Sequence, residues 1–215
     1  MRVQMDDVLF ARIHGCVGPA FFALTVALAV VTSPWWREAS QRPEQSGGAA
    51  LGRLAVATVA LAYLQLVLGS ALRHMPVGAT PSDFRTAALF HVLVAVALVA
   101  QIVWLTVMVL RTAWAEPKLV RPAVALCLLV LVQIGLGLGT WVVKYGWPIW
   151  LGGGEHLAGF VVQAEGWWQA HITTAHVATG SLILAVSLVL ALRSLRQVRQ
   201  VPLGLPRTRA LGVAA

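Results

Sequence analysis

The stretch LQLVLGSALRH at residues 64–74 and the stretch FHVLVAVALVAQ at residues 90–101 together decide how this chain folds. The first is apolar except for Gln65 and the Arg-His pair at its end, and the second carries His91 near its start. Runs of this hydropathy predict membrane helices, and a polar side chain inside such a helix usually has a partner or a function. His91 is therefore the first candidate for a functional site.

The same order of segments returns further along the chain. VQIGLGLGTWVVK at residues 132–144 carries Gln133, and AHVATGSLILAV at residues 175–186 carries His176. The pattern predicts two repeats, each a glutamine helix followed by a histidine helix. Internal repeats in membrane proteins often place a ligand at the repeat interface.

The composition supports a protein embedded in a membrane. Of the 215 residues 59% are hydrophobic and 11% are charged, whereas soluble domains carry about 25% charged residues. About 20 apolar residues suffice to span a bilayer, and a spanning segment must be helical because its backbone finds no water there. The sequence predicts an all-α integral membrane protein with five transmembrane helices, at about 9–33, 54–74, 86–110, 119–143 and 172–192.

We expect four parts along the chain. These are an N-terminal transmembrane helix (1–37), a polar linker (38–53), a four-helix bundle of two helix-pair repeats (54–193) and a basic cytoplasmic tail (194–215). A cleaved signal peptide is the alternative for the first helix, but its start lacks the usual basic segment. Cys16 and Cys127 are expected at opposite membrane depths, too far apart for a disulfide.

The net charge of +8 is distributed unevenly between the two ends of the predicted helices. Eleven of the 16 Lys and Arg residues lie between the first and second spans, around the connection of the third and fourth spans, or from residue 193 onward; the others are Arg2, Arg12, Arg73, Arg85 and Lys144. The positive-inside rule places the C-terminus in the cytoplasm and the N-terminus outside. A multi-pass protein of the cytoplasmic membrane follows, with lipid rather than nucleic acid as the partner of its basic residues.

Three histidines begin helices that run inward and should lie at similar depth: His14, His91 and His176. A small residue follows each of them by four positions, on the same helix face: Gly18, Ala95 and Gly180. An imidazole above such a flat space suits a porphyrin, and two facing imidazoles complete a six-coordinate haem iron. His91 and His176 are the expected axial pair, because they match between the repeats. The alternative is that each histidine only bonds a neighbouring helix.

Other candidates lie at the outer ends of the helices. His74 is expected to bind the cofactor, bond a propionate or face water, while His156 and His171 are expected in solvent. Arg73, Arg85 and Lys144 suit either haem propionates or lipid headgroups. Glycines such as Gly69 and Gly137 allow close approach, whether of another helix or of a cofactor.

These segments resemble the haem A synthase family, membrane proteins of cytochrome oxidase assembly. LQLVLGSALRH (64–74) is similar to the family's glutamine–glycine helix, and AHVATGSLILAVSLVLALR (175–193) to its final histidine helix. HGCVGPAFFALTVALAV (14–30) resembles the last helix of the family's first half. The resemblance implies one complete half that binds haem b, O or A between His91 and His176. It leaves His14 as a possible second iron ligand, completed by a second copy or a separate subunit.

Two departures from the family pattern bear on activity. The family's glutamate, one turn before a pocket histidine, is replaced at the matching positions Ala11, Ala88 and Thr173, and its external cysteine pair is missing. Glu155 and Glu165 are the remaining acids that could substitute. The catalytic residues therefore stay open. The resemblance implies oxidation of the haem O methyl group to formyl, with the oxidase assembly machinery as partner. The alternatives are a b-type cytochrome that carries electrons, an inactive haem-handling paralogue, or a cofactor-free subunit or transporter.

Overall fold

The computed structural model describes residues 5–38, 48–76, 78–145 and 166–198, which fold into helices without a strand among them. Five of the helices are long and apolar enough to cross a membrane, as predicted. They are α1 (Met5–Val31), α3 (Gly48–Arg73), α4 (Pro81–Thr112), α5 (Pro117–Tyr145) and α7 (Trp167–Val198); the short helix α2 (Pro34–Glu38) follows α1. The chain is a multi-pass membrane protein by these spans.

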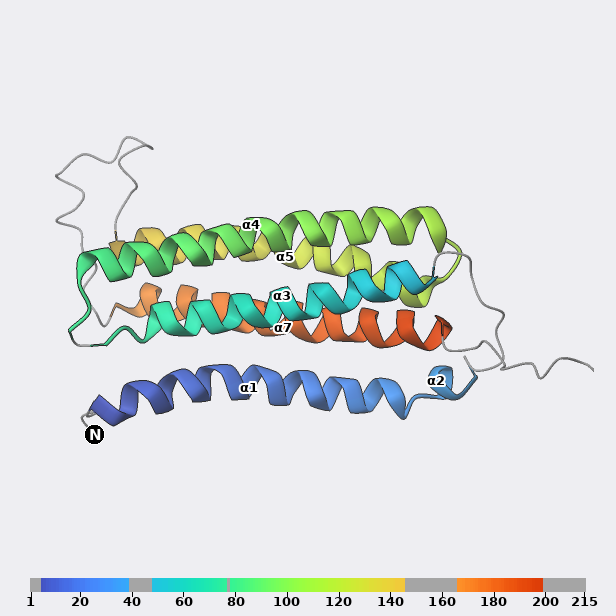
Figure 1. The fold of residues 1–215 in the computed structure, drawn as a ribbon, viewed down its shortest axis with the longest axis horizontal. Helices are drawn as coiled ribbons and strands as arrows, with labels where there is room; N and C mark the ends of the chain where they lie inside the picture. Colours follow the sequence, from blue (N-terminus) through green and yellow to red (C-terminus); the bar gives the residue numbers. More distant parts are fainter. Residues whose placement is uncertain (1–4, 39–47, 77, 146–165, 199–215) are drawn as a thin grey trace, which may run out of the picture.

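Four of these helices, α3, α4, α5 and α7, form a bundle with alternating direction, and α1 lies along its α3–α7 side (Figure 1). In the bundle α3 packs against α4 and α7, and α5 packs against the same two helices. Therefore α4 and α7 stand on one diagonal of the bundle, and α3 and α5 on the other. Short connections between antiparallel neighbours are typical of such bundles.

The helix ends follow from local sequence. At the start of α4, the Thr80 hydroxyl accepts a bond from the Asp83 N–H, and the Asp83 carboxylate accepts one from the Thr80 N–H. This reciprocal cap is followed by Pro81, whose missing N–H costs nothing in the first turn. Pro117 begins α5 in the same way. At α3 the helix starts at Gly48, inside the segment expected as linker, because Leu51 is buried and Gly52 packs against Leu195 of α7.

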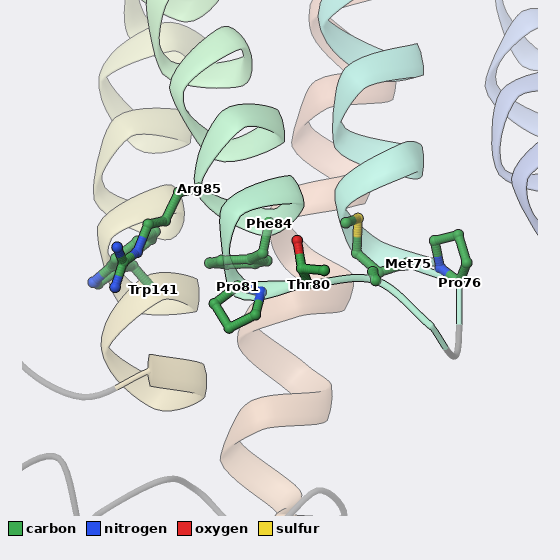
Figure 2. Close-up of a pocket in the computed structure, with 8 residues that line it drawn as sticks. Met75, Pro76, Thr80, Pro81, Phe84, Arg85 and Trp141 are labelled. Atoms are coloured by element: carbon green, nitrogen blue, oxygen red, sulfur yellow. The ribbon is translucent and has the colours of Figure 1, made fainter.

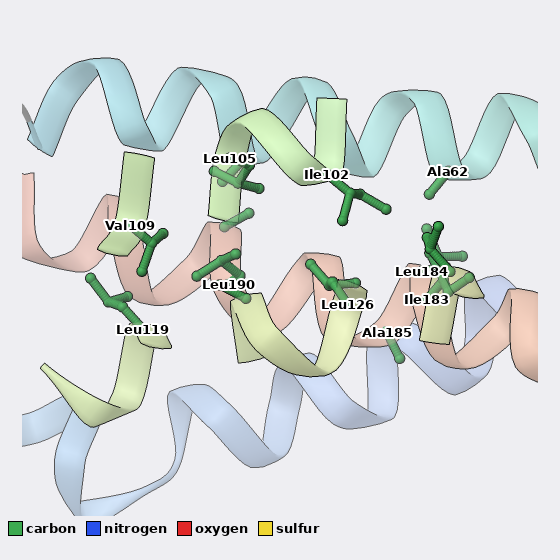
Figure 3. Packing of buried hydrophobic residues seen from close by; sticks show 14 of the residues in the cluster. Ala62, Ile102, Leu105, Val109, Leu119, Leu126, Ile183, Leu184, Ala185 and Leu190 are labelled. Carbon is green, nitrogen blue, oxygen red and sulfur yellow. The ribbon is translucent and has the colours of Figure 1, made fainter. Parts of the chain in front are cut away.

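The half of the bundle toward the end of α7, the inner half, is a closely packed apolar core (Figure 3). Its fully buried side chains include Ile102 and Leu105 of α4, Leu126 of α5 and Leu190 of α7. Small buried residues such as Ala123 let the helices approach closely, as membrane helices require. Large apolar side chains on the outer faces, among them Phe21 and Leu131, stay exposed, as lipid-facing residues do.

Candidate functional site

Two glutamine–histidine pairs occupy the other half of the bundle, toward the α3–α4 connection, which is the outer half. The Gln65 amide nitrogen of α3 lies 3.2 Å from Nε2 of His91 on α4, and the Gln133 amide nitrogen of α5 lies 3.5 Å from Nε2 of His176 on α7. Each glutamine therefore holds the histidine of its own repeat. The two predicted repeats are equivalent in this contact.

The two histidines face each other along the α4–α7 diagonal. Their ring centroids are 6.5 Å apart, and the ring planes meet at 66°. Both side chains are half-buried. The structure thus brings together the two imidazoles that the sequence paired. Both glutamines lie at the same level of the bundle as the imidazoles that they contact.

Two glycines fix the position of the imidazoles. A Cβ atom on Gly69 would lie 3.1 Å from Cε1 of His91, and one on Gly137 would lie 3.2 Å from Cε1 of His176. Each glycine comes four residues after the glutamine of its helix, so glutamine and glycine present one face to the histidine. Sequence reasoning linked these glycines only to close approach in general. The repeated Gln-x-x-x-Gly spacing was the signal that could have assigned them to the histidines.

The small residues four positions after the histidines have different surroundings. Gly180 lies against the Gln133 amide nitrogen, which would be 3.3 Å from an added Cβ. Ala95 is half-buried in α4, and Gly18 on α1 has open space around it. Of the two glycines, Gly180 therefore lies against a Gln–His pair and Gly18 does not.

Several polar atoms at this site are buried without a hydrogen-bond partner. They are Nδ1 of His91, Nδ1 of His176 and the amide oxygens of Gln65 and Gln133. Whichever way the amides are turned, each imidazole keeps one ring nitrogen without a partner. Buried polar groups are normally satisfied, so these atoms are available to a water molecule or to a ligand.

The donor set fits a haem iron better than a metal ion held by protein alone. Within the described ranges, no three His, Cys, Asp or Glu side chains are grouped to hold an ion. A haem iron takes four ligands from the porphyrin and needs only two imidazoles. Two imidazole–metal bonds of about 2 Å, plus half a ring on each side, separate the centroids by roughly 6 Å, and the observed separation is 6.5 Å.

A hollow of about 570 Å³ lies at the end of the bundle where α3 connects to α4. It is lined by Phe84 and Arg85 of α4, Trp141 of α5 and the connection from α3 to α4 around Pro76 (Figure 2). The rings of Phe84 and Trp141 lie 6.4 Å apart. Since Phe84 precedes His91 by seven residues, the hollow begins about 10 Å from the histidine along α4. Arg85 is the cationic side chain in the lining of this hollow. Arg73 is exposed and is the last residue of α3, just before the α3–α4 connection.

The third histidine of the predicted set lies away from this site. His14 is exposed on α1, which packs against the α3–α7 side of the bundle and is not one of its four helices. The outer end of α1 is fixed to α3, because Arg12 Nε donates to the carbonyl oxygen of His74 and the Ser70 hydroxyl donates to the carbonyl of Arg12. His74 is half-buried at the end of this contact.

The remaining candidates are only partly described. His171 is exposed, stacks on the Trp167 ring and hydrogen-bonds the Trp167 carbonyl oxygen. It therefore takes no part in the His91–His176 pair. Glu155, His156 and Glu165 lie outside the described residues. At the positions of the missing family glutamate, Ala88 and Thr173 are buried and Ala11 is half-buried.

The fold and the site define a helical membrane protein with a pair of facing histidines inside a four-helix bundle. No model of a known protein family matches the chain, and neither does any curated protein or solved structure.

Proposed function

We propose that this chain is a membrane haem protein whose iron is held between His91 and His176. The observation that carries the proposal is the facing of two imidazoles, at 6.5 Å between centroids, from matching positions of two repeats. Both keep an unpartnered ring nitrogen in the bundle interior. Burying such atoms without a ligand is costly, and an iron ion would use them.

The surrounding residues have distinct tasks in this proposal. Gln65 and Gln133 orient the rings, and Gly69 and Gly137 leave the space into which the rings turn. Arg85 and the hollow beside Trp141 suit the polar edge of the porphyrin, with Arg73 further out. Haem supplies one-electron chemistry at its iron.

On the basis of the sequence resemblance, we propose a role in cytochrome oxidase assembly, related to haem A synthase. Methyl oxidation needs a pocket that manages protons as well as electrons. The positions that the resemblance matches to a glutamate hold Ala88 and Thr173. The acidic residues within the described ranges stand at helix ends: Asp6, Asp7, Glu38, Asp83 and Glu116. These replacements favour haem handling or electron transfer over oxidation of the macrocycle.

We further propose that the protein lies in the cytoplasmic membrane with its N-terminus outside and its C-terminus in the cytoplasm, since the basic residues gather at one end of the helices.

The exposed His14 binds a second haem only if a second copy of the chain or a separate subunit completes the site. Blue-native sizing combined with the haem-to-protein ratio tests this, and a monomer with one haem rules it out.

The test of the haem proposal is the reduced-minus-oxidised spectrum of the protein purified from haem-replete cells. We expect an alpha band, and we expect His91→Ala or His176→Ala to abolish most haem retention. His171→Ala is the matched control, because this exposed histidine lies on the same helix as His176. A colourless wild-type protein, or equal haem content in all three variants, would overturn the proposal.

Expression with haem O separates the two functional candidates. Conversion of the extracted pigment to haem A identifies an oxidising enzyme, whereas unchanged haem O with a reversible alpha band identifies a carrier or handling protein. Because the acid is replaced at Ala88 and Thr173, we expect unchanged haem O.

A further inference from the structure

Two arginine–tryptophan pairs attach helix α2 to the end of α7, at the opposite end of the bundle from the histidine pair. The guanidinium carbon of Arg193 lies 5.7 Å from the ring centroid of Trp35, and that of Arg196 lies 5.1 Å from the ring centroid of Trp36. Arg193 and Arg196 are three residues apart and so share a helix face. Arg196 Nε also donates to the carbonyl oxygen of Trp36.

This junction has hydrogen-bond donors in excess. Nε of Arg193 and Nε1 of Trp35 are both buried without a partner, and both can only donate. Arg193 uses one terminal nitrogen on the carbonyl oxygen of Lys118, at 2.9 Å. The carboxylate of Glu116 accepts the N–H of Lys118 at the start of α5 and is also an acidic neighbour of Arg193. The group that would satisfy the remaining donors must therefore be an acceptor, and the two guanidinium groups favour an anion.

The place of the junction indicates which anion can reach it. Tryptophans paired with arginines at the end of membrane helices mark the level of the lipid headgroups. The same end carries the excess of basic residues, which the positive-inside rule assigns to the cytoplasmic leaflet with its anionic lipids. A planar guanidinium binds phosphate oxygens in a bidentate manner.

We propose that the α2–α7 junction binds the phosphate group of an anionic phospholipid of that leaflet, through Arg193, Arg196 and the indole N–H of Trp35. The bound lipid fastens α2, and through it the inner end of α1, to the four-helix bundle. This inference is independent of haem binding, because the junction lies at the other end of the helices from His91 and His176 (Figure 1).

The experiment is a titration of the full chain, purified in neutral detergent, with phosphatidylglycerol while the thermal unfolding midpoint is recorded. We expect a rise of roughly 5 °C at a hundredfold excess over Kd. Phosphatidylcholine and inorganic phosphate at equal concentration should give much smaller shifts. An equal shift with phosphatidylcholine means a general lipid effect, and an equal shift with inorganic phosphate means a free-phosphate site; either result, or no shift at all, overturns the proposal.

Variants locate the effect. The double variant Arg193→Gln, Arg196→Gln should lose most of the phosphatidylglycerol shift. Arg111→Gln should keep it, since this exposed arginine ends α4 at the same end of the bundle. If both lose the shift equally, net charge alone is responsible and the junction is not the site.

A milder variant tests the proposed lipid contact even if the double variant does not fold. Trp35→Phe keeps an aromatic ring under Arg193 but removes the indole N–H. We expect its apparent affinity for phosphatidylglycerol to fall several-fold while its unfolding midpoint without lipid stays close to that of the wild type. An unchanged affinity would contradict the proposed contact.

Discussion

The imidazole of His91 stands across the bundle from that of His176, with the ring planes at 66° to each other. Each ring is approached from the side by a glutamine of the helix that precedes it in the chain. The site is therefore a four-residue arrangement with one side chain from each helix of the bundle.

We predict that Gln65→Leu or Gln133→Leu lowers haem affinity by about tenfold or more, because loss of a residue that orients a metal-bound imidazole typically has an effect of this size. The measurement is haem content per folded protein, together with the midpoint potential, which a purely structural change would leave in place. Gln101→Leu is the control. Its amide donates to the Leu54 carbonyl between α4 and α3, so its loss should affect stability and leave the potential unchanged.

We predict that Gly137→Ala disturbs the site although it adds only one methyl group. The new Cβ would lie 3.2 Å from Cε1 of His176, so the ring must shift. The expected result is a changed low-spin haem spectrum and reduced haem retention. Gly135→Ala is a close control, since an added Cβ there meets nothing within 4 Å. Identical spectra for the two variants would mean that Gly137 does not position the ring.

The five spans could be predicted from the sequence because their apolar length alone requires membrane helices. The matching of His91 with His176 followed from the repeat, since equal positions in equal helix pairs reach equal depth. The contacts of Gln65 and Gln133 with these rings could not be predicted, because they depend on how each helix is rotated about its axis. Helices that are apolar nearly all round give no single face by which to fix that rotation.

The position of α1 against the bundle could not be predicted from the sequence either. Its large apolar residues point in many directions, so hydropathy does not say which face meets the bundle. The structure places it against α3 and α7, where Gly15 leaves room for the Ser70 hydroxyl, 2.8 Å from an added Cβ. This contact depends on a glycine and a serine from distant parts of the chain, and no local pattern pairs them.

We predict that Leu126→Ala lowers the free energy of unfolding by about 2 kcal/mol or more, because it leaves a cavity in the inner core of the bundle. Leu126 is fully buried, whereas Leu131 on the same helix is exposed. Leu131→Ala should therefore change stability by little, since its side chain faces lipid in both variants. Chemical denaturation in detergent measures both. Equal losses would mean that the packed inner half does not stabilise the fold.

We predict that Thr106→Val lowers the free energy of unfolding by roughly 0.6 kcal/mol. This loss is smaller than the loss expected for Leu126→Ala. The Thr106 hydroxyl donates to the Ala123 carbonyl at 3.0 Å and accepts from the thiol of Cys127 at 3.2 Å, linking α4 to α5. Valine keeps the shape of the side chain and removes only these bonds. A small loss is expected because, in the membrane, the unfolded state also finds partners for the freed groups. Denaturation of Thr106→Val and Thr106→Ser separates the two contributions: serine keeps the hydroxyl and loses a methyl group. If valine destabilised the protein more than serine by several kcal/mol, the hydrogen bonds between α4 and α5, rather than packing, would dominate the stability of the inner half.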